Sequence, residues 1–244
     1  MINNNIIKTN DINNFINNPN KSFKIIKLNI SNKIKEILLN LNINQYNVFN
    51  YYGKKKLDIN SNEYNSLINL FNTDNNIKSI NSLCKFIKKL LLQVCNEYNK
   101  KYCWLTIRIM PPNNVYNIPR WHFDGNYYKS NNIQTKFILT LKGNSTLIIN
   151  PNQKIKKKFF NNFFNIDLKD NSELELRLLR NKIVNNEKII NINTLINGTI
   201  IISTNPKLAT IHSEPLIMEN RIFLSILPMT KNEFNDFKIR RNIK

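Results

Sequence analysis

The chain has 244 residues, of which 41% are hydrophobic and 21% are charged, and its formal net charge is +20. Its length and hydrophobic content suit one folded domain with a sizeable core and argue against a disordered chain. The positive charge is compatible with a polyanionic partner, either nucleic acid or an anionic membrane surface. Lysine outnumbers arginine by 29 to 7 and is spread along the chain, whereas arginine is the residue expected for bidentate phosphate recognition, so we favour a solvated surface set by compositional bias over nucleic-acid binding.

The first hundred residues carry apolar side chains every three or four positions, which is typical of amphipathic helices. The predicted elements are helices at 11–16, 31–42, 61–71 and 77–98, a strand at 23–30, and a short strand or turn at 46–52. Ser31 and Ser61 are placed to cap two of these helices. We therefore expect residues 1–99 to form a mainly helical portion that packs on the outside of a β-domain.

The pattern changes near residue 100, where β-branched and aromatic residues gather in short runs broken by Pro and Gly. The predicted strands are 102–110, 137–141, 145–150, 188–196, 199–203, 209–213 and 221–227. Lys142-Gly143-Asn144 indicates a hairpin. Residues 174–184 fit either a strand or a helix, and the lysine runs at 54–56 and 154–158 are predicted to be solvated loops.

Many short strands predict a double-sheet jelly roll of the cupin type. The expected fold class is therefore α+β, with a double-stranded β-helix at residues 100–230 and a basic tail at 231–244. The three cysteines make no disulfide framework, because Cys84 and Cys95 would lie about 16 Å apart on one helix. Without a signal peptide or membrane span, we expect a soluble protein in the cytoplasm or nucleus.

The two histidines of the chain, His122 and His212, are the strongest functional signal. His122 lies two residues before Asp124 on a predicted strand, so both side chains point to one face, while Phe123 points into packing. His212, 88 residues after Asp124, supplies a third ligand from a later strand. Two histidines and one carboxylate form the facial triad that holds non-haem Fe(II), whereas structural zinc takes a fourth protein ligand. These three residues are the predicted metal ligands and catalytic centre.

Arg221 follows His212 by nine residues. The turn after Glu214-Pro215 is expected to return it on the neighbouring strand, beside His212. A guanidinium in that place would form a bidentate pair with a carboxylate bound near the metal.

This set resembles the Fe(II)/2-oxoglutarate-dependent dioxygenases, whose core is a double-stranded β-helix. The resemblance covers about residues 100–230 and rests on WHFDG at 121–125, GTIIIS at 198–203, IHSEP at 211–215 and RIFLSI at 221–226. It implies that the two histidines and Asp124 bind iron, and that Arg221 anchors the far carboxylate of 2-oxoglutarate. It also implies an oxidoreductase that uses molecular oxygen to convert 2-oxoglutarate to succinate while hydroxylating or demethylating a prime substrate.

Departures from the family pattern leave the anchor of 2-oxoglutarate open. Many relatives carry serine two residues after the arginine, where this chain has Phe223, and the nearest serine is Ser225. Lys136, twelve residues after Asp124, takes the place of a co-substrate lysine in JmjC-type relatives. We favour Arg221, because a buried arginine without a partner is costly.

Further polar residues flank the motif. Tyr128, with Tyr116 and Tyr127, is a candidate to add a hydroxyl to the co-substrate pocket, although an aromatic residue at such a site is more often its wall. Arg108 and Arg120 are candidates for substrate binding, and ion pairs with surface acids are the alternative.

The leading hypothesis is an oxygenase that acts on a protein side chain or a nucleic acid base. A cupin-like binding domain without turnover and a metal enzyme of other chemistry on the same ligands are the alternatives. Arg221 argues against other metal chemistry, because a 2-oxoglutarate enzyme needs a cation there. Succinate release would separate the oxygenase from a binding domain.

Overall fold

The computed structural model describes residues 5–7, 11–43, 45–72, 76–112, 117–130, 133–165 and 172–243. Tyr116 lies outside these ranges. The helices are α1 Asp11–Asn17, α2 Asn32–Asn40, α3 Asn62–Leu70, α4 Ile77–Glu97, α5 Gln153–Asn165, α6 Glu173–Val184 and α7 Lys231–Arg240. The strands are β1 Phe23–Lys27, β2 Asn47–Lys54, β3 Tyr102–Met110, β4 Thr135–Lys142, β5 Leu147–Ile149, β6 Ile189–Ile190, β7 Asn197–Ile202, β8 Ile211–Ser213 and β9 Arg221–Met229.

The strands form two sheets, and every pair of neighbouring strands is antiparallel. The larger sheet has the order β1-β7-β4-β9-β3-β2, and the smaller has the order β6-β5-β8. The fold is therefore mixed α/β with antiparallel sheets, as the sequence predicted in outline. This strand order does not by itself establish a double-stranded β-helix, which stays a prediction.

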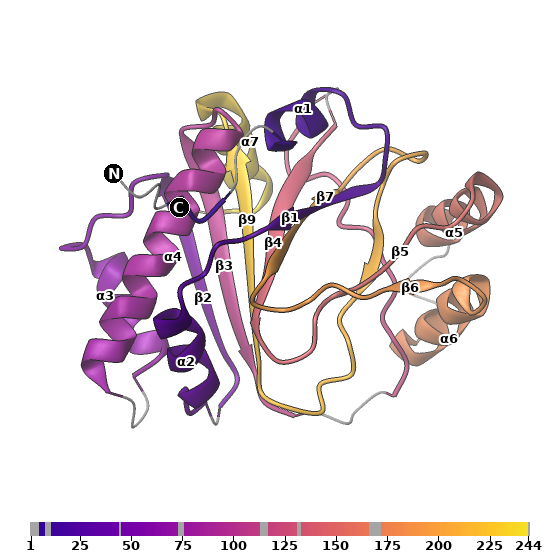
Figure 1. The fold of residues 1–244 in the computed structure, drawn as a ribbon. Helices are drawn as coiled ribbons and strands as arrows, with labels where there is room; N and C mark the ends of the chain where they lie inside the picture. The colour runs from indigo at the N-terminus through magenta and orange to yellow at the C-terminus, as the bar shows by residue number, and fades with distance from the viewer. Residues whose placement is uncertain are drawn as a thin grey trace.

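Helices α2, α3 and α4 lie together on one side of the large sheet, while the small sheet lies on the other with α5 and α6 beyond it (Figure 1). The predicted caps are present, since the side chains of Ser31 and Ser61 accept hydrogen bonds from the first turns of α2 and α3. Because α4 buries nine side chains along one stripe, it contributes most of the helical side of the main core. None of the helices in the described ranges is long and apolar enough to cross a membrane.

The first hundred residues also supply both edges of the large sheet. β1 pairs with β7, and β2 pairs with β3 over eight residue positions. The N-terminal portion thus contributes two strands to the large sheet as well as the helices that pack against it. The helices and the sheet also share one hydrophobic core cluster. It contains buried residues of α2, α3 and α4 and alternate residues of β3, β4 and β9.

The hairpin predicted at Lys142-Gly143-Asn144 is wrong. β4 pairs with β7 and β9, whereas β5 pairs with β6 and β8, so this turn carries the chain from one sheet to the other. Gly143 has a φ of +78°, and a Cβ atom built there would lie 2.7 Å from the carbonyl oxygen of Asn220. The turn therefore passes too close to the start of β9 for any other residue.

The lysine run at 154–158, predicted to be a solvated loop, lies in helix α5, and α6 follows it in the described part of the chain. Phe159 is buried against the small sheet, and Lys156 is buried with its ammonium group bonded to the hydroxyl of Ser22. The apolar residues at helical spacing in this segment thus favour a helix, although lysines lie between them. Residues 174–184, which fitted a strand or a helix, are helical, and the predicted strand at 188–196 shrinks to β6.

The C-terminal residues, predicted to be a basic tail, form α7 with a capping box between Thr230 and Glu233. Phe234 and Phe237 are buried in a cluster with residues of β9. An ion pair of 2.8 Å between Lys100 and Glu233 joins α7 to the beginning of β3. Arg241, which follows the last residue of this helix, lines the cavity described next.

Candidate metal centre

His122 and His212 face each other across a short antiparallel bridge. The backbone N–H of His122 donates to the carbonyl of His212 at 2.9 Å, and the reverse bond measures 3.1 Å. His212 lies on β8, but His122 belongs to no named strand, so the strand predicted around 121–125 is reduced to this one bridge. Directly opposed residues place their side chains on the same face, and the two ring centroids are 4.4 Å apart.

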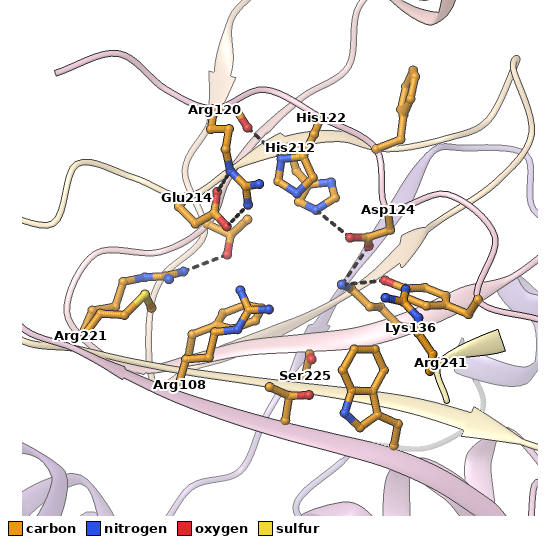
Figure 2. Close-up of a pocket in the computed structure, with 17 residues that line it drawn as sticks. Arg108, Arg120, His122, Asp124, Lys136, His212, Glu214, Arg221, Ser225 and Arg241 are labelled. Carbon is orange, nitrogen blue, oxygen red and sulfur yellow. Dashed lines mark hydrogen bonds and ion pairs between the residues drawn. The ribbon is translucent and has the colours of Figure 1, made fainter. Parts of the chain in front are cut away.

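Asp124 completes a cluster of three potential ligands. One ligand atom from each of His122, Asp124 and His212 lies within 4.8 Å of the others. The carboxylate Oδ1 of Asp124 is 3.6 Å from Nε2 of His212 (Figure 2). Phe123 points the other way, against the rings of α5, as strand alternation predicted.

The tautomer of both histidines is set by backbone carbonyls. Nδ1 of His122 lies 2.7 Å from the carbonyl oxygen of Arg120, and Nδ1 of His212 lies 3.0 Å from that of Thr210. Because a carbonyl can only accept, each Nδ1 carries the proton, and each Nε2 keeps its lone pair for a metal. Burial, reinforced by the neighbouring His212, lowers the pKa of His122 to about 3, so its imidazole is neutral.

The carboxylate of Asp124 is shared between the cluster and Lys136. The Lys136 ammonium lies 2.8 Å from Oδ2 of Asp124 and 3.0 Å from the hydroxyl of Tyr127. Burial would raise the pKa of Asp124, but Lys136 and the histidines hold it well below its usual range. One carboxylate oxygen is thus paired with a cation, while the other faces His212.

A cavity of about 330 Å³ opens on this cluster. Its floor is the face of the large sheet that the helices leave uncovered, and its far wall is the bridge between the two histidines. Alternate residues of β3 and β9 form the floor. They are Trp104, Thr106, Arg108 and Met110 of β3 and Arg221, Phe223 and Ser225 of β9.

Arg221 is only 1% exposed and lies at one end of this floor. Its guanidinium donates to the carbonyl of Asn144 at 2.8 Å, to the hydroxyl of Thr146 at 3.0 Å and to that of Thr140 at 3.4 Å. No described carboxylate forms an ion pair with it. Burial lowers the pKa of Arg221 to about 10, so it still carries its charge at neutral pH.

The path predicted for Arg221 needs correction, although the cavity does receive its side chain. β8 pairs with β5, whereas β9 pairs with β3 and β4, so Arg221 and His212 lie on different sheets. They approach each other across the cavity, not along one sheet. The turn at Gly143 brings Asn144 under the guanidinium and therefore helps to position it.

The other predicted site residues divide into two groups. Arg108 and Arg120 line the cavity, and Arg120 pairs with Glu214 at 2.6 Å. Tyr128 does not line it, since it packs with the aromatic residues of α7. Its neighbour Tyr127 is the tyrosine whose hydroxyl enters the cavity and bonds Lys136.

Sequence reasoning missed three features of the site. Thr140, Thr146 and the carbonyl of Asn144 hold Arg221, Glu214 neutralises Arg120, and Arg241 reaches the cavity from the end of α7. Strand alternation is the one sequence signal that bears on the cavity, because it places Trp104 and Thr106 on the same face as Arg108. It does not predict the three features named above.

No protein-family model and no curated protein matches the chain. Among solved structures, it is similar to a prolyl-4-hydroxylase of Pseudomonas putida, with 7% identity, a TM-score of 0.40, and 92% of this chain and 94% of that chain covered. The dioxygenase for auxin oxidation in rice has 6% identity, a TM-score of 0.43 and coverages of 88% and 76%. A prolyl hydroxylase from Trichoplax adhaerens, in complex with a peptide of hypoxia inducible factor, has 12% identity, a TM-score of 0.42 and coverages of 92% and 90%.

Proposed function

We propose that the protein is an Fe(II)- and 2-oxoglutarate-dependent oxygenase. One observation carries the proposal: the ligand cluster of His122, Asp124 and His212 shares a cavity with the buried guanidinium of Arg221, which has no described carboxylate partner. A buried cation of this kind is costly unless an anion reaches it. A dicarboxylate that also meets a metal at the triad would satisfy both.

The donor set fits Fe(II). Two imidazoles and one carboxylate leave coordination positions open for ligands that are not protein groups. Both Nε2 lone pairs are available because the carbonyls of Arg120 and Thr210 fix the tautomers. Together, bound Fe(II) and 2-oxoglutarate would supply oxygen activation coupled to decarboxylation, and the substrate would be hydroxylated or demethylated.

The residues of the chain have distinct roles in this proposal. Arg221 binds the far carboxylate of 2-oxoglutarate in a fork-like contact, and its threonine partners keep the guanidinium plane fixed. Lys136 holds Oδ2 of Asp124, which leaves Oδ1 for the metal. Lys136 is thereby occupied, which favours Arg221 over Lys136 as the anchor.

The proposal includes two finer points. The two antiparallel sheets are taken as a variant of the double-stranded β-helix, with the cavity between them. The reacting group of the prime substrate, whether it belongs to a protein side chain, a nucleic acid base or a smaller compound, has to fit the cavity of about 330 Å³. That volume is at the low end for ligand sites.

Succinate release tests the proposal. Purified protein supplied with Fe(II), oxygen and 2-oxoglutarate is expected to form succinate slowly even without prime substrate. His122→Ala should abolish this turnover, whereas Ser213→Ala, next to the other histidine, should retain most of it. Equal succinate formation by wild type and His122→Ala would refute the proposal.

A further inference from the structure

Two more guanidinium groups line the cavity, those of Arg108 and Arg241. Neither has an ion-pair partner among the described residues. The two acids that line the cavity are already engaged, one with Lys136 and the other with Arg120. The cavity thus keeps an excess of positive charge even after Arg221 is assigned to 2-oxoglutarate.

Arg108 is fixed by the sheet. It lies in the middle of the pairing between β3 and β9, directly opposite Phe223. Its guanidinium points into the open part of the cavity, away from the cradle that holds Arg221 (Figure 2). The side chain is half-buried, so an anion that reaches it leaves much of its water behind and interacts more strongly.

Arg241 reaches the same cavity from the end of α7. Its guanidinium carbon lies 6.0 Å from the ring centres of both Trp104 and Tyr127. α7 itself is held in place, since Phe237 is buried and the carboxylate of Asp236 accepts a bond from the backbone of Lys129. The position of Arg241 is therefore set by a packed helix and not by a loose chain end.

Trp104 supplies a rigid apolar surface beside Arg241. Its indole N–H donates to the side chain of Asn50 at 3.0 Å, and Tyr52 stacks against it with centroids 6.0 Å apart. The ring remains half-buried and lines the cavity. A fixed aromatic surface next to guanidinium groups can hold the apolar body of a ligand at little entropic cost.

Tyr127 places Arg241 close to the ligand cluster. Its ring centre lies 6.0 Å from the guanidinium carbon of Arg241, and its hydroxyl bonds the ammonium group of Lys136, which pairs with Asp124. Arg108 lines the same cavity from β3, so the two guanidinium groups reach it from different elements.

We propose that Arg108, Arg241 and Trp104 form a second anion subsite, which takes the carboxylate or phosphate of a small organic anion while its apolar body lies on the indole. One part of this inference rests on the proposed function: the bound anion is taken to be the prime substrate, held next to His122, Asp124 and His212. Guanidinium groups bind either oxyanion in planar, bidentate contacts. Arg221, buried in its own cradle, serves a different carboxylate.

Calorimetric titrations of the apoprotein test the subsite without metal or 2-oxoglutarate. Benzoate and phenyl phosphate are the probes, their relative affinities distinguish carboxylate from phosphate, and benzyl alcohol is the neutral counterpart. We expect Arg108→Gln and Arg241→Gln each to weaken binding of the preferred anion at least about tenfold, equivalent to about 1.4 kcal/mol. Benzyl alcohol should bind far more weakly than either anion.

Arg240→Gln is the matched control, because Arg240 neighbours Arg241, pairs with Asp236 at 3.0 Å and does not line the cavity. It should leave the affinity unchanged. An equal loss in Arg240→Gln and Arg241→Gln would show attraction by net charge alone and overturn the subsite. Absence of binding to wild type, or a loss confined to Arg221→Gln, would overturn it as well.

The outcome is separable from that of the proposed function. A protein that binds aromatic anions through Arg108 and Arg241 but forms no succinate would keep the subsite and lose the oxygenase. Arg241→Gln changes an exposed residue after the last turn of α7, so it should fold normally, which urea unfolding curves will verify. In an active enzyme, the control variant Arg240→Gln should leave uncoupled succinate release unchanged.

Discussion

The two faces of the large sheet differ in chemical character, although the same strands form both. On β9, Ile222, Leu224 and Ile226 face the helices and belong to the main core, while Arg221, Phe223 and Ser225 face the cavity. β3 divides in the same way. One face is continuous hydrocarbon, and the other carries cations, hydroxyls and isolated aromatic rings.

This difference explains how the protein can contain a charged cavity and still fold stably. Burial on the helical face contributes most of the stability, because each large apolar side chain removed from water is worth about 1.5–3 kcal/mol. The cavity face can therefore keep groups that cost free energy, such as the guanidinium of Arg221. Substitutions on neighbouring residues of β9 should separate stability from function.

Leu224→Ala should give the largest loss of stability. The side chain is fully buried on the helical face, and its truncation leaves a void, so the free energy of unfolding should fall by about 2–5 kcal/mol. Ser225→Ala, one residue further along and on the other face, should change it by less than about 1 kcal/mol. Urea denaturation measures both, and similar losses would mean that the two faces do not differ as described.

Arg221→Gln should give the largest loss of co-substrate binding. Removing one partner of a buried charged contact costs about 2–5 kcal/mol, so the Kd for 2-oxoglutarate should rise at least about 30-fold. Arg240→Gln removes the same charge outside the cavity and should leave that Kd unchanged. Calorimetry on the metal-loaded protein gives both values. An unchanged Kd in Arg221→Gln would instead favour Lys136 as the anchor.

The turn at Gly143 carries the chain from the large sheet to the small one and passes close to the start of β9, so its replacement should disturb the packing there. Gly143→Ala meets a positive φ and a contact of 2.7 Å with a backbone oxygen, whereas Gly125→Ala meets a φ of +75° with no atom within 4 Å. Gly125→Ala should cost about 1–2 kcal/mol of unfolding free energy, and Gly143→Ala at least about 1 kcal/mol more. Equal costs would show that the turn can move away from β9.

The smallest effect concerns pH. The folded-state pKa of His122 is about 3, below the value of about 6.5 expected when unfolded, so the unfolded state binds the proton first as pH falls. The stability that neutral His122 contributes is therefore complete above about pH 6.5 and is lost as pH falls toward 3. His122→Gln should flatten the slope of unfolding free energy by up to about 1.4 kcal/mol per pH unit between pH 4 and 6. Parallel slopes would contradict a neutral, buried His122.

Local structure was largely predictable from the sequence. The helical period placed α2, α3 and α4 within a few residues, serine caps marked the starts of α2 and α3, and the β-branched run at 102–110 is β3. Alternation also predicted that Phe123 packs away from His122 and Asp124. These features depend on neighbours along the chain, so the local pattern contains the information.

Pairing between distant strands was not predictable in the same way. The signal at Gly143 is a turn signal only, and it does not say whether the next strand joins the same sheet. At 154–158 the lysines hid an apolar stripe that continues through Phe159 and Phe163 to make α5. Arg241 gave no local signal, because its role depends on where α7 packs.

The meeting of His122, Asp124 and His212 at one place was only partly predictable from the sequence. The i, i+2 spacing predicted that His122 and Asp124 share a face, but the arrival of His212 was inferred from the residue types that Fe(II) requires. The structure brings the three together through a bridge of a single residue pair. The least regular segment of the site thus supplies His122 and Asp124, two of the three proposed ligands, as is common for functional loops.

Anaerobic calorimetric titration with Fe(II) in the presence of 2-oxoglutarate tests the central claim most directly. The account predicts that wild type and Thr106→Ala, which alters the cavity floor without touching the ligands, bind a single Fe(II) per chain with similar affinity. His122→Ala and His212→Ala should each bind it at least about 100-fold more weakly. If either histidine variant binds Fe(II) as tightly as wild type, the cluster is not the metal centre.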